Sequence, residues 1–448
     1  MRIIIVGAGK VGHYLSERLS REGHEVVLID RDKIRLRRLE KELNILPVHG
    51  SGASARTLEE AGIDRTDLFI AVTDSDEVNL IACIISKQYN VRTRIARVRN
   101  EDFYAEGTPV GEKSLGIDLL ISPDLAMAEE ILTLSTRSDA FEVAEFAGGD
   151  VMLLGYYVNP DNPCAGIPLQ RLRKLPGVLV AIVREGTTII PRGGDQVEAG
   201  DRIYLVTRKK DVLTVEEMFG FSSRKPRNVF IIGGSIVGRL VARRMEQQGI
   251  KVRLVEKDAA ISEQLSSELE KTLILNCDGL ESHDLLEEGI DQADLVISVT
   301  SSDTVNILSS LLAKHHGARK CITHITRPDF VPMLGKLGID IALSRRMVAA
   351  NMILRFVRGG ESIVSVATLL GSDAEVVELK VPAGDRFNKV ALRDLSFPSG
   401  SIVGAIVRQD GHKKIIIPTG DTRLHADDNL VIFFARGAIS AVEQFLHG

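Results

Sequence analysis

The amino-acid sequence predicts an α/β protein with two doubly wound parallel sheets, each followed by a small α+β domain. Three observations support this prediction. A glycine-rich turn, "VGAGKVG" at residues 6–12, separates a short apolar run from an amphipathic stretch. Short β-branched runs alternate with helical patterns around this turn, as they do in parallel sheets with helices on both faces. The same plan then returns in the second half of the chain.

The internal repeat is visible when the sequence is shifted against itself by 226 residues. The shift matches Gly7 with Gly233, Gly12 with Gly238, Gly23 with Gly249 and Asp32 with Asp258, and it places Asp30 opposite Glu256. After a one-residue insertion, the segment 61–79 lies over 288–306. Because apolar, glycine and acidic positions stay in step over these lengths, the chain is interpreted as two copies of one plan.

The first part of each half is predicted to alternate strands and helices. In the first half we expect strands in 2–7, 25–30, 46–50, 67–73 and 92–98 and helices in 31–43 and 77–88. Val11, Leu15 and Leu19, spaced four apart, predict the buried stripe of a helix after the glycine turn. Val237, Val241 and Met245 repeat that stripe.

The second part of each half predicts a smaller β-rich domain. Apolar runs interrupted at Glu185-Gly186 and at Asp410-Gly411 are typical of β-hairpins, because glycine supplies the positive φ of a tight turn. Helical patterns at 123–137 and 344–358 connect the two kinds of domain, and "SSRKPRN" at 222–228 is the linker candidate between the halves. The predicted domains are 1–137, 138–221, 226–358 and 362–448.

Composition indicates a soluble, cytoplasmic, multidomain protein. The 448 residues carry a formal net charge of −5, which gives no reason to expect a nucleic-acid partner. No stretch approaches the roughly 20 apolar residues that span a bilayer. The N-terminus leads directly into a strand without a charged leader, so no signal peptide is expected. The four cysteines are widely spaced and are expected to be reduced.

The first glycine loop predicts a nucleotide site. Gly7 permits the tight turn, Gly9 lets a pyrophosphate approach the backbone, and Gly12 lets the helix pack on the strand, as in Rossmann-type domains. The phosphates would lie at the positive end of the helix that begins near Lys10 or Val11. Asp30 would accept hydrogen bonds from the ribose hydroxyls, which favours NAD(H) or a plain adenine nucleotide over NADP(H).

The second loop, "IGGSIVG" at 232–238, is an altered copy. Ser235 adds a side chain where a pyrophosphate needs bare backbone, although its hydroxyl can donate a hydrogen bond. Glu256 keeps the ribose partner, whereas His324 stands opposite Arg97 and weakens the cationic character of the site. Nucleotide binding and a purely structural role are both left open for this copy.

The remaining polar and charged segments do not predict a catalytic site. In "VTDSDEVN" at 72–79, Thr73 and Asp74 could line the nucleotide, while Asp76 could cap the following helix. His315-His316 is expected to be a solvated pair rather than a metal site, and 31–43 a solvated helix face. No G-x-S-x-G, H-E-x-x-H or G-K-[ST] motif is present, so the sequence predicts a binding protein and not an enzyme.

The combination of "IIIVGAGKVG", "LIDRD", "AGIDRTDLFIAVTDSDEVN" and "RIARVRNEDF" with a repeated β-rich module resembles the TrkA family of Trk potassium-uptake systems. In that family each half is an RCK (regulator of potassium conductance) unit, with a Rossmann-type TrkA-N domain followed by a small TrkA-C domain. The resemblance covers essentially the whole chain. It departs at Ser51, where family members commonly have the aspartate that Asp278 supplies in the second half, and at Ser235.

The resemblance implies a regulatory subunit that binds NAD(H), or in some members ATP or ADP. It implies a homo-oligomeric gating ring beneath a membrane-embedded potassium channel, and hence a peripheral position at the inner face of the cell membrane. The implied cofactor-binding residues are Gly7, Ala8, Gly9, Lys10, Val11, Gly12, Asp30, Thr73, Asp74 and Arg97 in the first copy, and Gly233, Gly234, Ser235, Ile236, Val237, Gly238, Glu256, Asp278 and Thr300 in the second. An NAD-dependent oxidoreductase and an RCK regulator of another cation transporter remain the alternatives.

Overall fold

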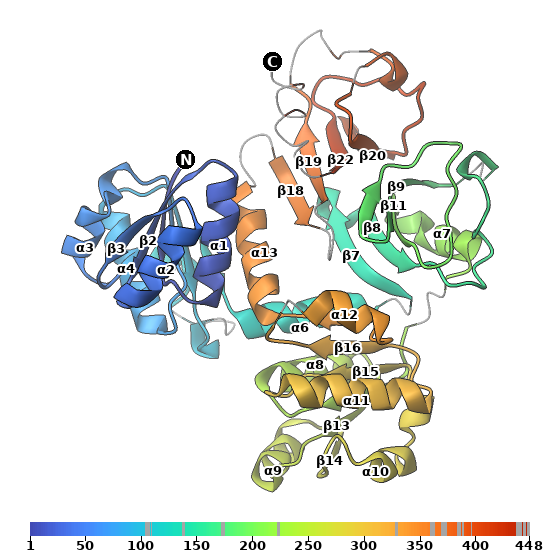
Figure 1. Cartoon of the computed structure of the whole chain (residues 1–448), viewed down its shortest axis with the longest axis horizontal. Helices are drawn as coiled ribbons and strands as arrows, with labels where there is room; N and C mark the ends of the chain where they lie inside the picture. The colour runs from blue at the N-terminus through green and yellow to red at the C-terminus, as the bar shows by residue number, and fades with distance from the viewer. Residues whose placement is uncertain are drawn as a thin grey trace. The chain divides into compact units, whose positions relative to one another are not determined.

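The computed structural model describes the chain except residues 104–107, 109, 137–138, 172–174, 222–224, 328–329, 359–362, 369–373, 383–386, 388, 396, 436–440, 442–444 and 446–448. It contains four sheets, two parallel and two antiparallel (Figure 1). Among the described residues, no helix is both long and apolar enough to cross a bilayer.

The first parallel sheet has the strand order β3-β2-β1-β4-β5-β6. This is the order of Rossmann-type sheets, which confirms the fold class that the sequence predicted. Its strands are β1 (Arg2–Val6), β2 (Glu25–Asp30), β3 (Leu46–His49), β4 (Leu68–Ala71), β5 (Thr93–Arg97) and β6 (Leu119–Ile121). Its helices are α1 (Lys10–Arg21), α2 (Lys33–Glu42), α3 (Ala55–Glu60), α4 (Asp76–Gln88), α5 (Glu112–Leu115) and α6 (Pro123–Ser135). Ile3, Ile4 and Ile5 of the central strand are fully buried, as expected where helices cover both faces.

The second parallel sheet repeats this order as β14-β13-β12-β15-β16-β17. Its strands are β12 (Asn228–Ile232), β13 (Lys251–Val255), β14 (Leu273–Leu275), β15 (Leu295–Ser298), β16 (Cys321–His324) and β17 (Ile341–Leu343). The helices that follow these strands along the chain are α8 (Ile236–Gln247), α9 (Ala259–Glu268), α10 (Ser282–Glu287), α11 (Asp303–His316), α12 (Val331–Lys336) and α13 (Arg345–Arg358). The repeat extends to the helix caps, because Asp32 and Asp258 each accept two backbone N–H groups at the start of α2 and α9.

The two small modules are five-stranded antiparallel sheets of the same topology, ordered β10-β9-β11-β8-β7 and β18-β19-β22-β20-β21. The first contains β7 (Ala140–Phe146), β8 (Val151–Tyr157), β9 (Gly177–Arg184), β10 (Thr187–Ile189), β11 (Arg202–Arg208) and α7 (Val212–Phe219). The second contains β18 (Ile363–Thr368), β19 (Glu375–Lys380), β20 (Ser401–Asp410), β21 (His412–Ile416) and β22 (Asn429–Phe434). The predicted hairpins are confirmed: β9 pairs with β10 and β20 with β21, and Gly186 and Gly411 have φ of 85° and 68°.

The two small modules also contact each other. The buried Glu378 of β19 accepts a hydrogen bond from the backbone N–H of Ala147 at 2.9 Å. Lys413 of β21 lies 2.7 Å from the carboxylate of Asp150. Polar contacts of this kind fix a register between the sheets that apolar packing alone would leave loose.

By its contacts the chain divides into two compact units. One consists of Met1–Glu130 with Leu343–Leu354, and the other of Ile131–Ala342 with Arg355–Gly448. The first unit therefore includes most of α13, a helix from the second half of the sequence (Figure 1). Arg345 at the start of α13 donates to Asp124 at 2.8 Å within this unit. The predicted boundaries near 137–138 and 358–362, and part of the linker at 222–228, lie on residues outside the described ones, and the domain limits stay predictions.

A buried lysine joins the second parallel sheet to the first small module. The ammonium of Lys320, just before β16, donates to the carbonyl oxygens of Leu134 and Ala140, both at 2.7 Å. Lys320 is 4% exposed. Burial lowers its pKa from 10.5 to about 8, and the carboxylates of Asp340 and Asp139 oppose that shift only in part. The lysine therefore links the two domains while carrying a charge that burial disfavours.

This burial predicts a pH dependence of stability. Between pH 8 and 10.5 the unfolded chain holds a proton on Lys320 that the folded chain releases, so the free energy of unfolding rises with pH in this window. Lys320→Met removes the titrating group. We expect the melting temperature of the wild type, minus that of Lys320→Met, to increase by a few degrees from pH 7 to pH 10 in scanning fluorimetry. A difference that is constant or falls with pH would contradict this account.

Candidate functional site

The first glycine loop follows β1 and is shaped by two close approaches. Gly7 has a φ of 105°, and a Cβ there would lie 2.9 Å from the backbone nitrogen of Thr73. A Cβ on Gly12 would lie 1.8 Å from the carbonyl oxygen of Gly7. The loop can therefore close between β1 and α1 only with glycine at both positions. The turn and packing roles predicted for these two residues agree with this geometry.

The same loop leaves the N-terminus of α1 open. Gly9 is the N-cap residue of α1, no side chain caps the helix, and a Cβ on Gly9 would meet no described atom within 4 Å. Lys10, the first helical residue, is exposed, and Val11 beside it is buried. An uncapped first turn directs backbone N–H groups and the positive end of the helix dipole at one point, and such a point attracts anions.

Asp30, at the end of β2, holds the loop from the side. One carboxylate oxygen accepts the N–H of Ala8 at 2.6 Å, and the other accepts the N–H of Asp32 at 2.8 Å. The side chain stays 14% exposed, and the guanidinium of Arg35 lies 3.9 Å from one of its oxygens. A carboxylate oxygen has two lone pairs, so each oxygen can accept a further hydrogen bond. The neighbouring Arg31 donates to Ser51 at 2.8 Å, so Ser51 lies beside the same strand end.

After the end of α1 and Asp30, the third side of the candidate site is formed by residues at the ends of β4 and β5. The buried Asn79 of α4 accepts from the Thr73 hydroxyl at 2.7 Å and donates to the carbonyl oxygens of Thr73 and Arg97 at 3.0 and 2.8 Å. It thereby joins the carboxyl ends of two neighbouring strands beside the glycine loop. Asn79 was not among the residues predicted for this site. The repeat gave a signal for it, because "VN" recurs in both copies with Asn306 at the matching position.

A cluster of charges completes this side of the candidate site. Arg97 and Arg99 both donate to Asp74, at 3.2 and 3.1 Å. Asp74 is 86% exposed, whereas the Arg97 side chain is 15% exposed. Burial, with Arg99 second, lowers the pKa of Arg97, and Asp74 opposes this. The buried Nε–H of Arg97 has no hydrogen-bond partner among the described residues. A ligand anion can therefore replace the exposed Asp74 as the partner of two arginines.

The alternative interpretation of Asp76 as a helix cap is wrong. Ser75 is the N-cap of α4, and its hydroxyl accepts the N–H of Val78. The carboxylate of Asp76 accepts the backbone N–H groups of Arg99 and Asn100, at 2.8 and 2.9 Å. Asp76 therefore positions the segment after β5 that carries Arg99, a long-range contact that the local pattern does not reveal.

The second copy repeats the frame of the first. Gly233 has a φ of 112°, and a Cβ on Gly238 would lie 2.2 Å from the carbonyl oxygen of Gly233. Glu256 accepts the N–H groups of Gly234 and Asp258, at 2.8 and 2.9 Å, as Asp30 does in the first copy. Ile236 begins α8 and Val237 is buried. The buried Asn306 of α11 again bridges a threonine, Thr300, and the carbonyl oxygen of His324.

The second copy differs where a phosphate would bind. The Ser235 hydroxyl donates to the carbonyl oxygen of Val299 at 2.8 Å and accepts the N–H of Gly238 at 3.3 Å. It therefore caps α8 with a group of the protein. His324 and Thr326 stand at the places of Arg97 and Arg99, and His324 is buried. Asp278 is exposed and accepts the N–H of Leu280 at 3.0 Å.

The structure thus brings the residues predicted for each copy to one edge of its sheet. The first copy offers free N–H groups, two arginines and a carboxylate, which suits an anion joined to a hydroxyl-bearing sugar. The second copy offers the carboxylate of Glu256 and the tight turn, but the Ser235 hydroxyl already caps the end of its helix. Among the described residues, no group of three or more His, Cys, Asp or Glu side chains is arranged to hold a metal ion.

Comparison with known proteins gives consistent matches over the whole chain. The TrkA-N domain model matches residues 3–123 and 229–345, and the TrkA-C domain model matches 153–220 and 376–447. Trk system potassium uptake protein TrkA homolog 1 of Methanosarcina mazei is 33% identical, over 99% of this chain and 100% of its own length. Trk system potassium uptake protein TrkA of Halomonas elongata is 35% identical, over 97% of this chain and 95% of its own.

Solved structures share the fold. The GsuK RCK domain superposes with a TM-score of 0.61 at 18% identity, covering 100% of this chain and 95% of that one. The GsuK channel bound to NAD gives the same score and identity, covering 79% of its chain. The full-length relatives are named as potassium uptake proteins and not as enzymes. With both domain models matched twice and relatives aligned end to end, the chain belongs to the TrkA family.

Proposed function

We propose that this protein is a nucleotide-binding regulatory subunit that gates a membrane potassium-uptake channel, held at the inner face of the membrane by that partner. The observation that carries the proposal is the uncapped N-terminus of α1 between Asp30 and Arg97. Family membership supports the potassium partner, because the relatives are named for potassium uptake.

The first site supports NAD(H) or an adenine nucleotide as ligand. A pyrophosphate at Gly9 would accept the free N–H groups of α1, and the ribose would donate to Asp30. Arg97 and Arg99 would neutralise the phosphate charge in place of Asp74. A 2′-phosphate would meet the carboxylate of Asp30, so NADP(H) is disfavoured. ATP and ADP remain candidates, because the GsuK structures include an ADP-bound form as well as the NAD-bound one.

The two sites are proposed to have unequal roles. In the second copy the Ser235 hydroxyl occupies a helix N–H group, and the two arginines are missing. We expect polyphosphates to bind there more weakly, so that the first copy senses the nucleotide and the second chiefly maintains the assembly. Gating then requires that the ligand prefer one conformation of the assembly. A differential affinity of about 1–3 kcal/mol shifts the channel equilibrium roughly 5- to 150-fold.

Exposed apolar residues support assembly into a homo-oligomeric ring. Ile81 and Ile84 on α4 are 46% and 39% exposed, and Leu308, which matches Ile81 in the repeat, is 44% exposed on α11. Isoleucines one turn apart form an apolar stripe in water, and a second copy of the chain would bury it. The same helix face in both halves thus supplies a surface for a ring of repeated units.

Replacing Gly9 tests the phosphate position. Gly9→Asp places a carboxylate in the open space at the end of α1, so we expect titration calorimetry to show loss of one NADH-binding event per chain. Gly9→Ala is the matched control, since its Cβ meets nothing within 4 Å and the φ of −68° suits alanine. It should keep the fold and weaken NADH binding less than Gly9→Asp does, because its methyl group carries no repelling charge. Unchanged binding by Gly9→Asp would rule out the proposed site.

Replacing Arg97 tests the charge cluster. Hydrogen bonds to charged groups contribute about 1.5–3 kcal/mol, so Arg97→Gln should weaken nucleotide binding by roughly 10-fold or more. The loss should be larger for ATP than for NADH, because ATP carries more negative charge. Arg92→Gln removes an exposed arginine next to the opposite end of β5 and should leave both affinities within twofold. Equal losses in the two variants would indicate a general charge effect and no specific contact.

A charge on the exposed stripe tests the ring. Ile81→Asp combined with Leu308→Asp should lower the assembly mass measured by light scattering, because burying a carboxylate in an apolar interface is costly. Ile34→Asp is the control, at an isoleucine of α2 that is 83% exposed. Pull-down of a Trk-type potassium channel subunit by the wild type would support the partner. Pull-down of another cation transporter in its place would favour the alternative RCK regulator.

A further inference from the structure

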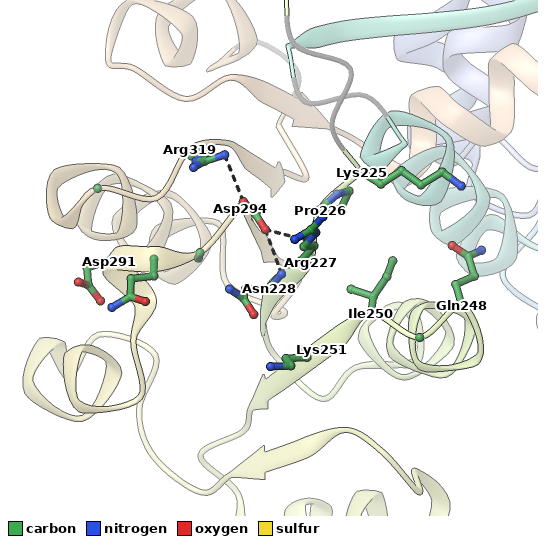
Figure 2. A pocket seen from close by; sticks show the side chains of 14 residues that line it. Lys225, Pro226, Arg227, Asn228, Gln248, Ile250, Lys251, Asp291, Asp294 and Arg319 are labelled. Carbon is green, nitrogen blue, oxygen red and sulfur yellow. Dashed lines mark hydrogen bonds and ion pairs between the residues drawn. The ribbon is translucent and has the colours of Figure 1, made fainter.

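A depression with excess positive charge lies at the edge of the second parallel sheet where its strands begin. It has a volume of about 1290 Å³ and is lined by residues from Lys225–Asn228, Gln248–Lys251, Asp291–Asp294, Gly317 and Arg319 (Figure 2). The glycine loop lies at the other edge, where these strands end. The depression is therefore separate from the candidate nucleotide site.

Four cationic side chains surround this depression, and two acids face them. The cations are Lys225, Arg227, Lys251 and Arg319, and the acids are Asp291 and Asp294. Asp294 is already engaged: it accepts the backbone N–H groups of Arg227 and Asn228, at 2.8 and 3.1 Å, and pairs with Arg319 at 3.5 Å (Figure 2). Within the described part of the chain, the side chains of Lys225, Arg227 and Lys251 have no hydrogen-bond or ion-pair partner.

In the first copy, the charged side chains at the corresponding edge of the sheet neutralise each other. Arg2 and Glu25 are register partners on β1 and β2, and their side chains form an ion pair. Arg2 also donates to the carbonyl oxygen of Ala61 at 3.1 Å. In the second copy the matching register partners on β12 and β13 are Asn228 and Lys251. The substitution of Glu25 by its counterpart Lys251 removes the pair and leaves an unneutralised cation at the same place.

We propose that this depression docks an acidic peptide segment of a partner protein. Three unpaired cations on a chain of net charge −5 form a local positive region, which attracts and orients a negative partner. Small-molecule sites usually occupy about 300–1,000 Å³ and bury most of their ligand, so this larger, exposed depression suits an extended chain better. The backbone groups at the strand starts are satisfied within the sheet, so recognition occurs through side chains.

The test restores the first-copy pair in the second copy. Asn228→Arg with Lys251→Glu gives the sheet edge an arrangement that the fold already accepts in β1 and β2. Fluorescence anisotropy measures binding of a fluorescein-labelled octaglutamate peptide in 50 mM salt. We expect the wild type to bind this peptide, a matching octaglutamine peptide not to bind, and the double variant to bind octaglutamate at least fivefold more weakly.

Controls distinguish a docking surface from general charge. Lys210→Gln changes the net charge by the same −1 as the double variant, at an exposed lysine that does not line the depression, and should keep the affinity within twofold. Lys225→Gln with Arg227→Gln is a second disruptive pair, used if the first lowers the melting temperature. NADH titration checks that the nucleotide site is unaffected, so failure here does not bear on the proposed gating function.

Three results would overturn the proposal. The first is equal octaglutamate binding by the wild type and both disruptive pairs. The second is an equal loss in Lys210→Gln, which would mean that the peptide senses only net charge. The third is a loss of sedimentation with phosphatidylglycerol vesicles in the disruptive variants while octaglutamate binding is unchanged, because that would assign the cations to a membrane surface.

Discussion

The contact between Gly12 and the carbonyl oxygen of Gly7 sets the geometry on which the rest of the site depends. No side chain fits between them, so α1 packs directly on the turn after β1. That packing points the first turn of α1 along the edge of the sheet where Asp30, Thr73 and Arg97 converge. Gly238 and Gly233 make the same contact in the second copy. The frame therefore persists in both halves, and the differences between them are confined to the side chains that the frame carries.

Those differences show how a duplicated site can diverge without refolding. Ser235 has a side chain where Gly9 has only a hydrogen atom, and this side chain caps α8. Its hydroxyl accepts a backbone N–H that would otherwise be open to a ligand. The capped end is stable without ligand, whereas the open end of α1 leaves N–H groups that an anion can satisfy. The loss of both arginines in the second copy acts in the same direction. The same backbone N–H groups can therefore be satisfied by a side chain of the protein, which stabilises the fold without ligand, or by a bound ligand, which gives affinity.

Much of the frame could be predicted from the sequence, because it depends on local pattern and on the repeat. Glycine spacing, apolar periodicity and the 226-residue shift predicted both parallel sheets, the helices after the glycine turns and the strand-end position of the acidic residues. The last strand of each sheet, β6 and β17, and the short helices α5 and α12 were not predicted. The bridging role of Asn79, the long-range contact of Asp76 and the buried position of Lys320 could not be predicted in this way. Each depends on which strands are neighbours and on which loops return to them, and side-chain type alone does not determine that. The inclusion of α13 in the first unit escaped prediction for the same reason.

The assignment of most of α13 to the first compact unit has a consequence for any division of the chain at the linker. The residues Leu343–Leu354 belong to the compact unit that Met1–Glu130 otherwise forms, although more than 200 residues separate the two segments. Neither half of the duplicated sequence therefore contains a whole compact unit. A fragment that ends near the linker would lack the residues of α13 that this unit includes, among them Arg345, the partner of Asp124. A split of the gene at the linker would therefore place parts of one compact unit on two separate chains.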